Sequence, residues 1–169
     1  MQTMNNCSWF VQLRFLTVAL VLFGVSAGCG AGEIPSEYKS FFALPATQER
    51  KEFHKYSLEK QIDIHLIAAT YFRPPNYGFS YDIAARGKEA IPPLLTRLKA
   101  DSEEAHREAI IYVFRDMAKF HYDFRNEKDT VEALKEFVNS MKGPFYREES
   151  ERLLKEILSA PKKSDTSLP

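Results

Sequence analysis

Apolar residues recur at spacings of three and four along most of the chain beyond residue 46, which is the spacing of one face of an α-helix. In residues 47–72 this stripe consists of Leu58, Ile62, His65, Leu66 and Ala69. Similar stripes predict further helices at residues 81–85, 89–99, 101–120, 131–141 and 147–158. No segment alternates between apolar and polar residues over the length of a strand, so the pattern predicts an all-α domain.

Proline, glycine and short polar residues mark where these helices begin and end. Pro74 and Pro75 end the helix at residues 47–72, because proline lacks the backbone N–H that a helix needs. Gly87 suits a left-handed turn between two helices, since it has no Cβ to clash there. Asp101 and Glu104 form an aspartate variant of the capping box, in which each side chain satisfies backbone N–H groups at a helix start.

Residues 87–118 contain a glycine, an Ala-hydrophobic-Pro step, a leucine-rich helix, an aspartate at a turn and an arginine early in a second helix. These residues are Gly87, Ala90, Ile91, Pro92, Pro93, Leu94, Leu95, Leu98, Asp101 and Arg107. The order resembles one unit of a HEAT-like repeat, which implies a small right-handed array of antiparallel helix pairs. The flanking helices contain no clear copy of the motif, so a helical bundle without repeats remains an alternative.

An apolar and uncharged run lies near the start of the chain, at residues 15–25, directly after Arg14. The run is too short to cross roughly 30 Å of hydrocarbon comfortably as a helix. Small residues follow it and lead to Cys29. A basic flank, a short apolar run and small residues are typical of an export signal.

The four residues that end at Cys29, Ser-Ala-Gly-Cys, resemble the lipobox of bacterial lipoproteins. The resemblance implies that residues 1–28 are a signal peptide and that lipid on Cys29 anchors the protein at the periplasmic face of a membrane. Gly30 in place of aspartate favours the outer membrane in a Gram-negative host. Ser26 departs from the branched aliphatic residue usual there, and two alternatives stay open: cleavage after Ala27, which yields a soluble periplasmic or secreted protein, and a retained membrane anchor.

The length and the net charge of the chain restrict the number of domains and the class of partner that it can have. The chain has 169 residues, which leaves room for one domain once the signal peptide is removed. We assign residues 29–44 to a tether, residues 45–159 to the all-α HEAT-like domain and residues 160–169 to a disordered tail. Basic and acidic residues are both 23, a balance that provides no electrostatic footprint for nucleic acid.

The chain lacks the motifs that usually carry catalysis or hold a cofactor. Its cysteines, Cys7 and Cys29, leave the domain without a thiol for a disulfide, a metal or a nucleophilic reaction. The histidines do not form the His-Glu-x-x-His pattern of zinc enzymes, and no Gly-x-Ser-x-Gly or phosphate-binding glycine loop is present. We therefore expect no metal, no cofactor and no enzymatic activity. We interpret His65 as a hydrogen-bonded core residue, and the acidic pairs at 103–104 and 148–149 as solvated helix caps.

Two aromatic segments are the candidates for binding a partner. The first is a proline-stiffened loop, and the second follows the end of the helix at residues 101–120. Their candidate residues are Tyr71, Arg73, Tyr77, Phe79 and Tyr81 in the first segment and Arg115, His121 and Tyr122 in the second. Tyrosine and arginine are enriched at interface hot spots, although rings in such loops also fill gaps between helices.

The sequence thus predicts a membrane-tethered, non-enzymatic module that binds a protein partner in the cell envelope. A hydrolase with a carboxylate-based site is one alternative, and two convergent carboxylates or a histidine-carboxylate pair in a cleft would favour it. A small-ligand carrier is another, and it requires a closed apolar cavity between helices.

Overall fold

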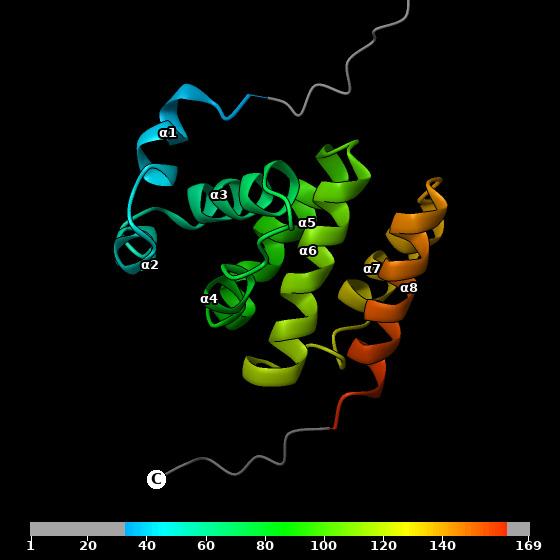
Figure 1. The fold of residues 1–169 in the computed structure, drawn as a ribbon. Helices are drawn as coiled ribbons and strands as arrows, with labels where there is room; N and C mark the ends of the chain where they lie inside the picture. Colours follow the sequence, from blue (N-terminus) through cyan, green and yellow to red (C-terminus); the bar gives the residue numbers. More distant parts are fainter. Residues whose placement is uncertain (1–32, 162–169) are drawn as a thin grey trace, which may run out of the picture. The chain divides into compact units, whose positions relative to one another are not determined.

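The computed structural model describes residues 33–161, and these residues form helices and loops without a strand (Figure 1). In chain order the elements are α1 (Ser36–Phe42), α2 (Ala46–Phe53), α3 (Leu58–Tyr71), α4 (Ser80–Ala84), η1 (Gly87–Ala90), α5 (Ile91–Ala100), α6 (Glu104–Asp116), η2 (Met117–His121), α7 (Lys128–Ser140) and α8 (Pro144–Ser159). The all-α prediction is confirmed for this part of the chain. The predicted signal peptide, the predicted lipid site at Cys29 and the residues beyond 161 lie outside the described residues.

Helix α6 is the centre of the fold. It contacts α3, α4, α5 and α8, and Figure 1 shows it between α3 and α4 on one side and α7 and α8 on the other. Its second half is buried on several faces: Ala109, Ile110, Ile111, Val113 and Phe114 are all 0% exposed. Apolar residues on several faces of one helix are buried only when neighbouring helices surround it. The neighbours of α6 on both sides cover these residues.

The single helix expected at residues 47–72 is wrong, because the structure divides it into α2 and α3. Ser57 begins α3 as its N-cap, and its hydroxyl accepts a hydrogen bond from the backbone N–H of Lys60 at 3.4 Å. The amide of Gln61 donates to the carbonyls of Phe53 and Tyr56, each at 3.1 Å. These bonds satisfy backbone groups at the break, so the chain can turn there without leaving buried carbonyls unpaired.

Residues 36–42, which we assigned to the tether, instead form helix α1 and pack on the domain. Tyr38 and Phe41 are buried, at 5% and 1% exposed. The ring of Phe41 lies 5.8 Å from that of Phe79 and 6.5 Å from that of Phe53. Burial of two large rings supplies the stabilisation that so short a helix lacks by itself.

The segment that carries the repeat resemblance folds largely as predicted. Gly87 has a positive φ of 59°, which confirms the left-handed turn. Pro92 and Pro93 lie in the first turn of α5, where their missing N–H groups are not needed. The next helix continues beyond α6 as the π-helical η2, which ends at His121, one residue after the predicted end.

The capping box predicted for Asp101 and Glu104 is wrong. Asp101 accepts a hydrogen bond from the backbone N–H of Glu103 at 2.9 Å and forms a turn ahead of α6. Glu104 instead reaches the loop between α7 and α8, where it accepts from the backbone N–H of Gly143 at 2.8 Å. Gly143 is the N-cap residue of α8, so Glu104 caps a helix other than its own.

Both C-terminal helices begin earlier than predicted, at Lys128 for α7 and at Pro144 for α8. Pro144 occupies the first turn of α8, a position that proline favours. Among residues 33–161, none of the helices combines the length and the apolar character needed to cross a bilayer.

Candidate functional site

A surface cavity of about 420 Å³ lies where the loop after α3 meets α6 and the start of α8. Its lining comes from three segments that are far apart in the sequence. The lining residues are Ala69, Thr70, Arg73, Pro75, Tyr77, Ala105, Glu108, Tyr112, Phe145, Tyr146 and Glu149. We call it the aromatic cavity, because four of these side chains are tyrosine or phenylalanine. Phe145 is 72% exposed, an unusual position for so large an apolar ring.

A stack of two tyrosine rings forms one wall of the aromatic cavity. The rings of Tyr77 and Tyr112 are nearly parallel, with centroids 4.0 Å apart and an angle of 19° between their planes. The guanidinium carbon of Arg115 lies 4.7 Å from the centroid of Tyr112. Nη2 of Arg115 in turn donates to Oδ1 of Asp116 at 2.6 Å, and the hydroxyl of Ser80 donates to the same buried carboxylate. The ion pair of Arg115 and Asp116 therefore packs against Tyr112 and supports the stack.

Two carboxylates of the aromatic cavity have opposite electrostatic environments. Glu149 accepts a hydrogen bond from the hydroxyl of Tyr112 at 2.7 Å and another from Nε of Arg152 at 2.8 Å. The bond from Arg152 is the main reason why the pKa of Glu149 is lowered. Glu108 is only 4% exposed, and its burial together with the charge of Glu149 raises its pKa to about 7. A hydrogen bond from Tyr77 opposes that rise.

The hydroxyls of Tyr77 and Tyr112 remain protonated at neutral pH. Burial raises the pKa of Tyr112 to about 12, and it also raises the pKa of Tyr77 well above its usual value. Both hydroxyls can therefore donate hydrogen bonds to the two carboxylates or to a bound group.

Beside the cavity, a histidine links an aspartate to a threonine hydroxyl. Nδ1 of His106 lies 2.7 Å from Oδ2 of Asp101, and Nε2 lies 3.4 Å from Oγ1 of Thr70. The Thr70 hydroxyl donates to the backbone carbonyl of Leu66 at 2.7 Å. Its proton therefore points to its own helix rather than to His106.

Of the residues predicted to bind a partner, the structure brings Arg73 and Tyr77 together in the aromatic cavity. Arg73 lies on the exposed rim and donates from Nη1 to the backbone carbonyls of Thr70 at 2.7 Å and Phe72 at 2.9 Å. Tyr71 is half-buried at the end of α3, two residues before Arg73. The centroid of its ring lies 5.7 Å from that of the Phe72 ring.

Phe79 does not belong to this surface. It is 6% exposed and its ring stacks on Phe53 with centroids 4.6 Å apart, so it fills a gap between helices. This is the packing role that we considered as the alternative for the loop.

A separate exposed aromatic patch contains Tyr81 and His121. Their rings lie 4.3 Å apart in an edge-on arrangement, and the ring of Phe120 lies 5.7 Å from that of Tyr81. Tyr81 is 45% exposed and Phe120 is 53% exposed. Tyr122 lies apart from this pair, because its hydroxyl donates to Glu127 at 2.7 Å. The structure thus places Arg73 and Tyr77 on one surface and Tyr81 and His121 on another, and it leaves Tyr71, Phe79 and Tyr122 outside both.

The two carboxylates and the remaining aromatic residues of the cavity were missed. Glu149 was interpreted as a solvated cap in the first turn of α8, but it lies beyond that turn and contacts Tyr112. The four-residue spacing of Glu108 and Tyr112 and the three-residue spacing of Tyr146 and Glu149 place each pair on one face of its helix. That spacing was a usable signal, although it does not show that the two faces meet.

His65 confirms its predicted role in the core. It is 0% exposed, and its Nε2 donates to the backbone carbonyl of Ala109 at 3.0 Å. Burial lowers its pKa to about 4, so the ring is neutral near pH 7. Within residues 33–161, histidines, cysteines and carboxylates do not come together in groups of three that could hold a metal ion.

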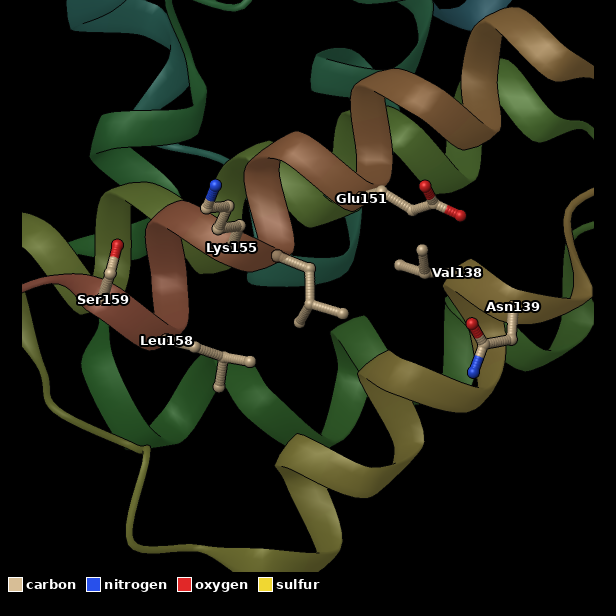
Figure 2. A pocket seen from close by; sticks show the side chains of 7 residues that line it. Val138, Asn139, Glu151, Lys155, Leu158 and Ser159 are labelled. Carbon is tan, nitrogen blue, oxygen red and sulfur yellow. The ribbon is translucent and has the colours of Figure 1, made fainter.

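A second groove, of about 450 Å³, lies between α7 and α8 (Figure 2). Its lining residues are Val138, Asn139, Glu151, Leu154, Lys155, Leu158 and Ser159. Figure 2 shows Lys155 and Ser159 pointing away from α7. The groove has no aromatic ring and one carboxylate, so it offers fewer specific contacts than the aromatic cavity.

Comparison with known proteins found no match: no family model, no curated protein and no solved structure is significantly similar to this chain. The function of this chain is therefore inferred from its residues and their geometry.

Proposed function

We propose that this protein is an envelope lipoprotein, tethered by lipid on Cys29, whose helical domain binds a protein partner without catalysing a reaction. The observation that carries the proposal is the aromatic cavity, with its stacked Tyr77 and Tyr112 and its exposed Phe145. Partly buried tyrosine rings with polar hydroxyls, placed beside an exposed ring, are typical of protein recognition sites.

Rigidity of the cavity supports the same function. Tyr77 follows two prolines in the chain, and its ring is held by Tyr112. Tyr112 in turn lies against Arg115, which is paired with Asp116. A wall that is already ordered loses little conformational entropy when a partner binds.

We further propose that α5 with α6 and α7 with α8 are two helix pairs of a right-handed, HEAT-like array. Each pair is in contact, and α6 also contacts α8. The turn at Gly87, the prolines of α5 and the turn at Asp101 are consistent with this arrangement. Stacked pairs bury the apolar faces that one pair leaves exposed. In such an array the aromatic cavity lies on the surface shared by α6 and α8.

The tether is proposed from the lipobox resemblance. Acyl chains on Cys29 would anchor the domain durably, because two or more buried chains hold a protein at a membrane. Mass spectrometry of the N-terminal peptide of the purified protein tests this directly. A peptide that begins at an acylated Cys29 is the expected result, and a peptide that begins at Gly28 without lipid would overturn it.

Site-specific photo-crosslinking in intact cells tests the binding proposal. A photoreactive amino acid in place of Phe145, on the cavity, is compared with the same residue in place of Lys135, which is exposed on α7. We expect a defined cross-linked protein at position 145 that is absent at position 135. Equal labelling at both positions would show that the cavity has no dedicated partner.

Arg73→Ala is the cleanest variant for this surface, since its side chain lies on the exposed rim. It should weaken the cross-link at position 145 and change the thermal stability little. Tyr77→Ala is less specific, because it also removes the stack on Tyr112. A large stability loss in Tyr77→Ala is thus expected from packing alone.

An envelope hydrolase is the second candidate, and two arrangements favour it. Glu108 and Glu149 line one cavity, and their pKa values are shifted in opposite directions, as in pairs that act as acid and base. Asp101, His106 and Thr70 follow one another in the order of a nucleophilic triad. We rank binding first, because the Thr70 hydroxyl is bonded to a backbone carbonyl instead of activated by His106.

Ester hydrolysis separates the two functions. If the protein is a binding module, the wild type should hydrolyse p-nitrophenyl acetate no faster than the matched variant Thr70→Val. Turnover that Thr70→Val or Glu108→Gln abolishes would overturn the non-enzymatic proposal. The small-ligand carrier has less support, since the aromatic cavity opens to solvent and carries two carboxylates.

A further inference from the structure

Glu108 is the least compensated charge of the aromatic cavity. The residue is 4% exposed, and no salt bridge between the described residues includes it. Arg152, the cation that favours the charged form of Glu108, is already paired with Glu149, and Arg73 on the exposed rim donates to backbone carbonyls. A buried carboxylate without a cationic partner is costly unless something supplies the opposite charge.

The groups that surround Glu108 come from each element that packs around the cavity. The loop after α3 contributes the hydroxyl of Tyr77, which donates to Glu108. Helix α8 contributes the negative Glu149, which disfavours the charged form of Glu108, and the positive Arg152, which favours it. The remaining charged or titratable side chains that line the cavity are Arg73, Tyr112 and Tyr146.

We propose that the aromatic cavity binds a basic side chain of the partner, the ammonium of a lysine or the guanidinium of an arginine, with the Glu108 carboxylate as its counter-ion. The proposal deepens the binding function proposed above and rests on it. A cation in the cavity would form the ion pair that Glu108 lacks. It would also lie next to Glu149, so both carboxylates would attract it.

The aromatic lining also favours a cation over an anion. Aromatic rings present a negative face that attracts ammonium and guanidinium groups. Tyr112 of the cavity wall already makes such a contact, with the guanidinium of Arg115 at 4.7 Å. The rings of Phe145 and Tyr146 lie at the other side of the lining, on α8, and would contact the apolar stem of a long basic side chain. A cavity of about 420 Å³ has room for such a side chain.

Binding of this kind depends on pH in a defined direction. The pKa of Glu108 is about 7, so the carboxylate is mostly protonated below that pH and mostly charged above it. Only the charged form attracts a cation. Between about pH 6 and about pH 8 the charged fraction rises roughly tenfold, and the apparent affinity should rise by about the same factor.

The test is a titration of the full chain, isolated from membranes in detergent and labelled with 3-fluorotyrosine, followed by fluorine NMR. The probes are N-acetyl-lysine methylamide and N-acetyl-arginine methylamide, and N-acetyl-norleucine methylamide is the neutral control of similar shape. The variant Tyr146→Phe identifies the signal of Tyr146, which lines the cavity. We expect the two basic probes, but not the neutral one, to shift the cavity signals.

Two variants and one change of pH complete the experiment. Glu108→Gln should weaken binding of the basic probes at least tenfold, whereas Glu151→Gln, the same change in an exposed pair with Arg147, should leave it unchanged. The wild type should bind about tenfold more weakly at about pH 6 than at about pH 8. This last measurement does not depend on the folding of any variant.

Three results would overturn the cation site: equal binding of the neutral probe, equal binding by Glu108→Gln, or no change of affinity with pH. The outcome is separable from that of the proposed function. Probe binding without a cross-link at position 145 would refute the proposed protein partner and support the cation site. A specific cross-link without probe binding would refute the cation site and support the protein partner.

Discussion

Replacing Glu108 with glutamine removes a titratable group from the wall of the aromatic cavity while it keeps nearly the same shape. The pKa of Glu108 is raised from its ordinary 4.5 to about 7 in the folded chain, chiefly by burial. The unfolded chain therefore releases its proton at a lower pH than the folded chain does. A raised folded pKa contributes stability below about pH 4.5, and this contribution is lost as the pH rises through about 7.

The size of the effect follows from the shift. Each pKa unit corresponds to about 1.4 kcal/mol, so the full shift sets an upper limit of about 3 kcal/mol. Because the cavity opens to solvent, which screens the charge, we expect about 1 to 2 kcal/mol. Glutamine has no proton to release, so Glu108→Gln should gain that much stability relative to the wild type between about pH 4.5 and about pH 8.

Urea unfolding measured at several pH values gives the difference between the two proteins directly. Titration of groups that both chains share, such as His65, cancels in this difference. Glu151→Gln serves as the control, because its carboxylate is exposed on α8, and its difference from the wild type should not vary with pH in the same way. A difference for Glu108→Gln that stays constant over this range would refute the assignment of a titrating carboxyl group to the cavity wall.

Substitutions at three other positions test the packing of the fold. Burial lowers the pKa of His65 to about 4, so the folded protein loses stability as the pH falls from about 6.5 through 4. The loss is about 3 kcal/mol at most. Urea unfolding of His65→Gln should not show this loss. Gly87→Ala should cost about 1 kcal/mol in thermal unfolding, because a φ of 59° strains a residue with a Cβ, and Gly87→Asn should cost less; equal stability of all three chains would contradict this. Asp116→Ala leaves the partly buried guanidinium of Arg115 and the hydroxyl of Ser80 without their acceptor. It should therefore lower the free energy of unfolding by about 3 kcal/mol. A loss below about 1 kcal/mol would show that the Arg115–Asp116 pair is not structurally important.

Local signals in the sequence were sufficient for the helical class and for several boundaries. The stripe of α6, the left-handed turn at Gly87 and the prolines in the first turn of α5 each depend on a few neighbouring residues. Their physical causes are helix periodicity, the freedom of glycine and the missing N–H of proline. Ser57 was a local signal as well, but it was overlooked inside a continuous apolar stripe, and α2 and α3 were read as one helix.

The aromatic cavity could not be predicted in this way. Its lining combines the loop after α3, the middle of α6 and the start of α8, and the carboxylates of Glu108 and Glu149 look like ordinary surface residues in the sequence. Glu104 illustrates the same limit, because it caps α8 across the fold and not its own helix. Side-chain burial and pKa depend on which helix faces meet.

By itself, then, the sequence determined that the body of this chain is helical, where several helices begin or end, and that His65 belongs to the core. Tertiary structure alone decided that Tyr77 stacks on Tyr112 and that a carboxylate with a raised pKa lies beside them. The reason is physical: helix propensity and capping act over a few residues, whereas a binding surface arises where distant segments pack and exclude water from the groups between them.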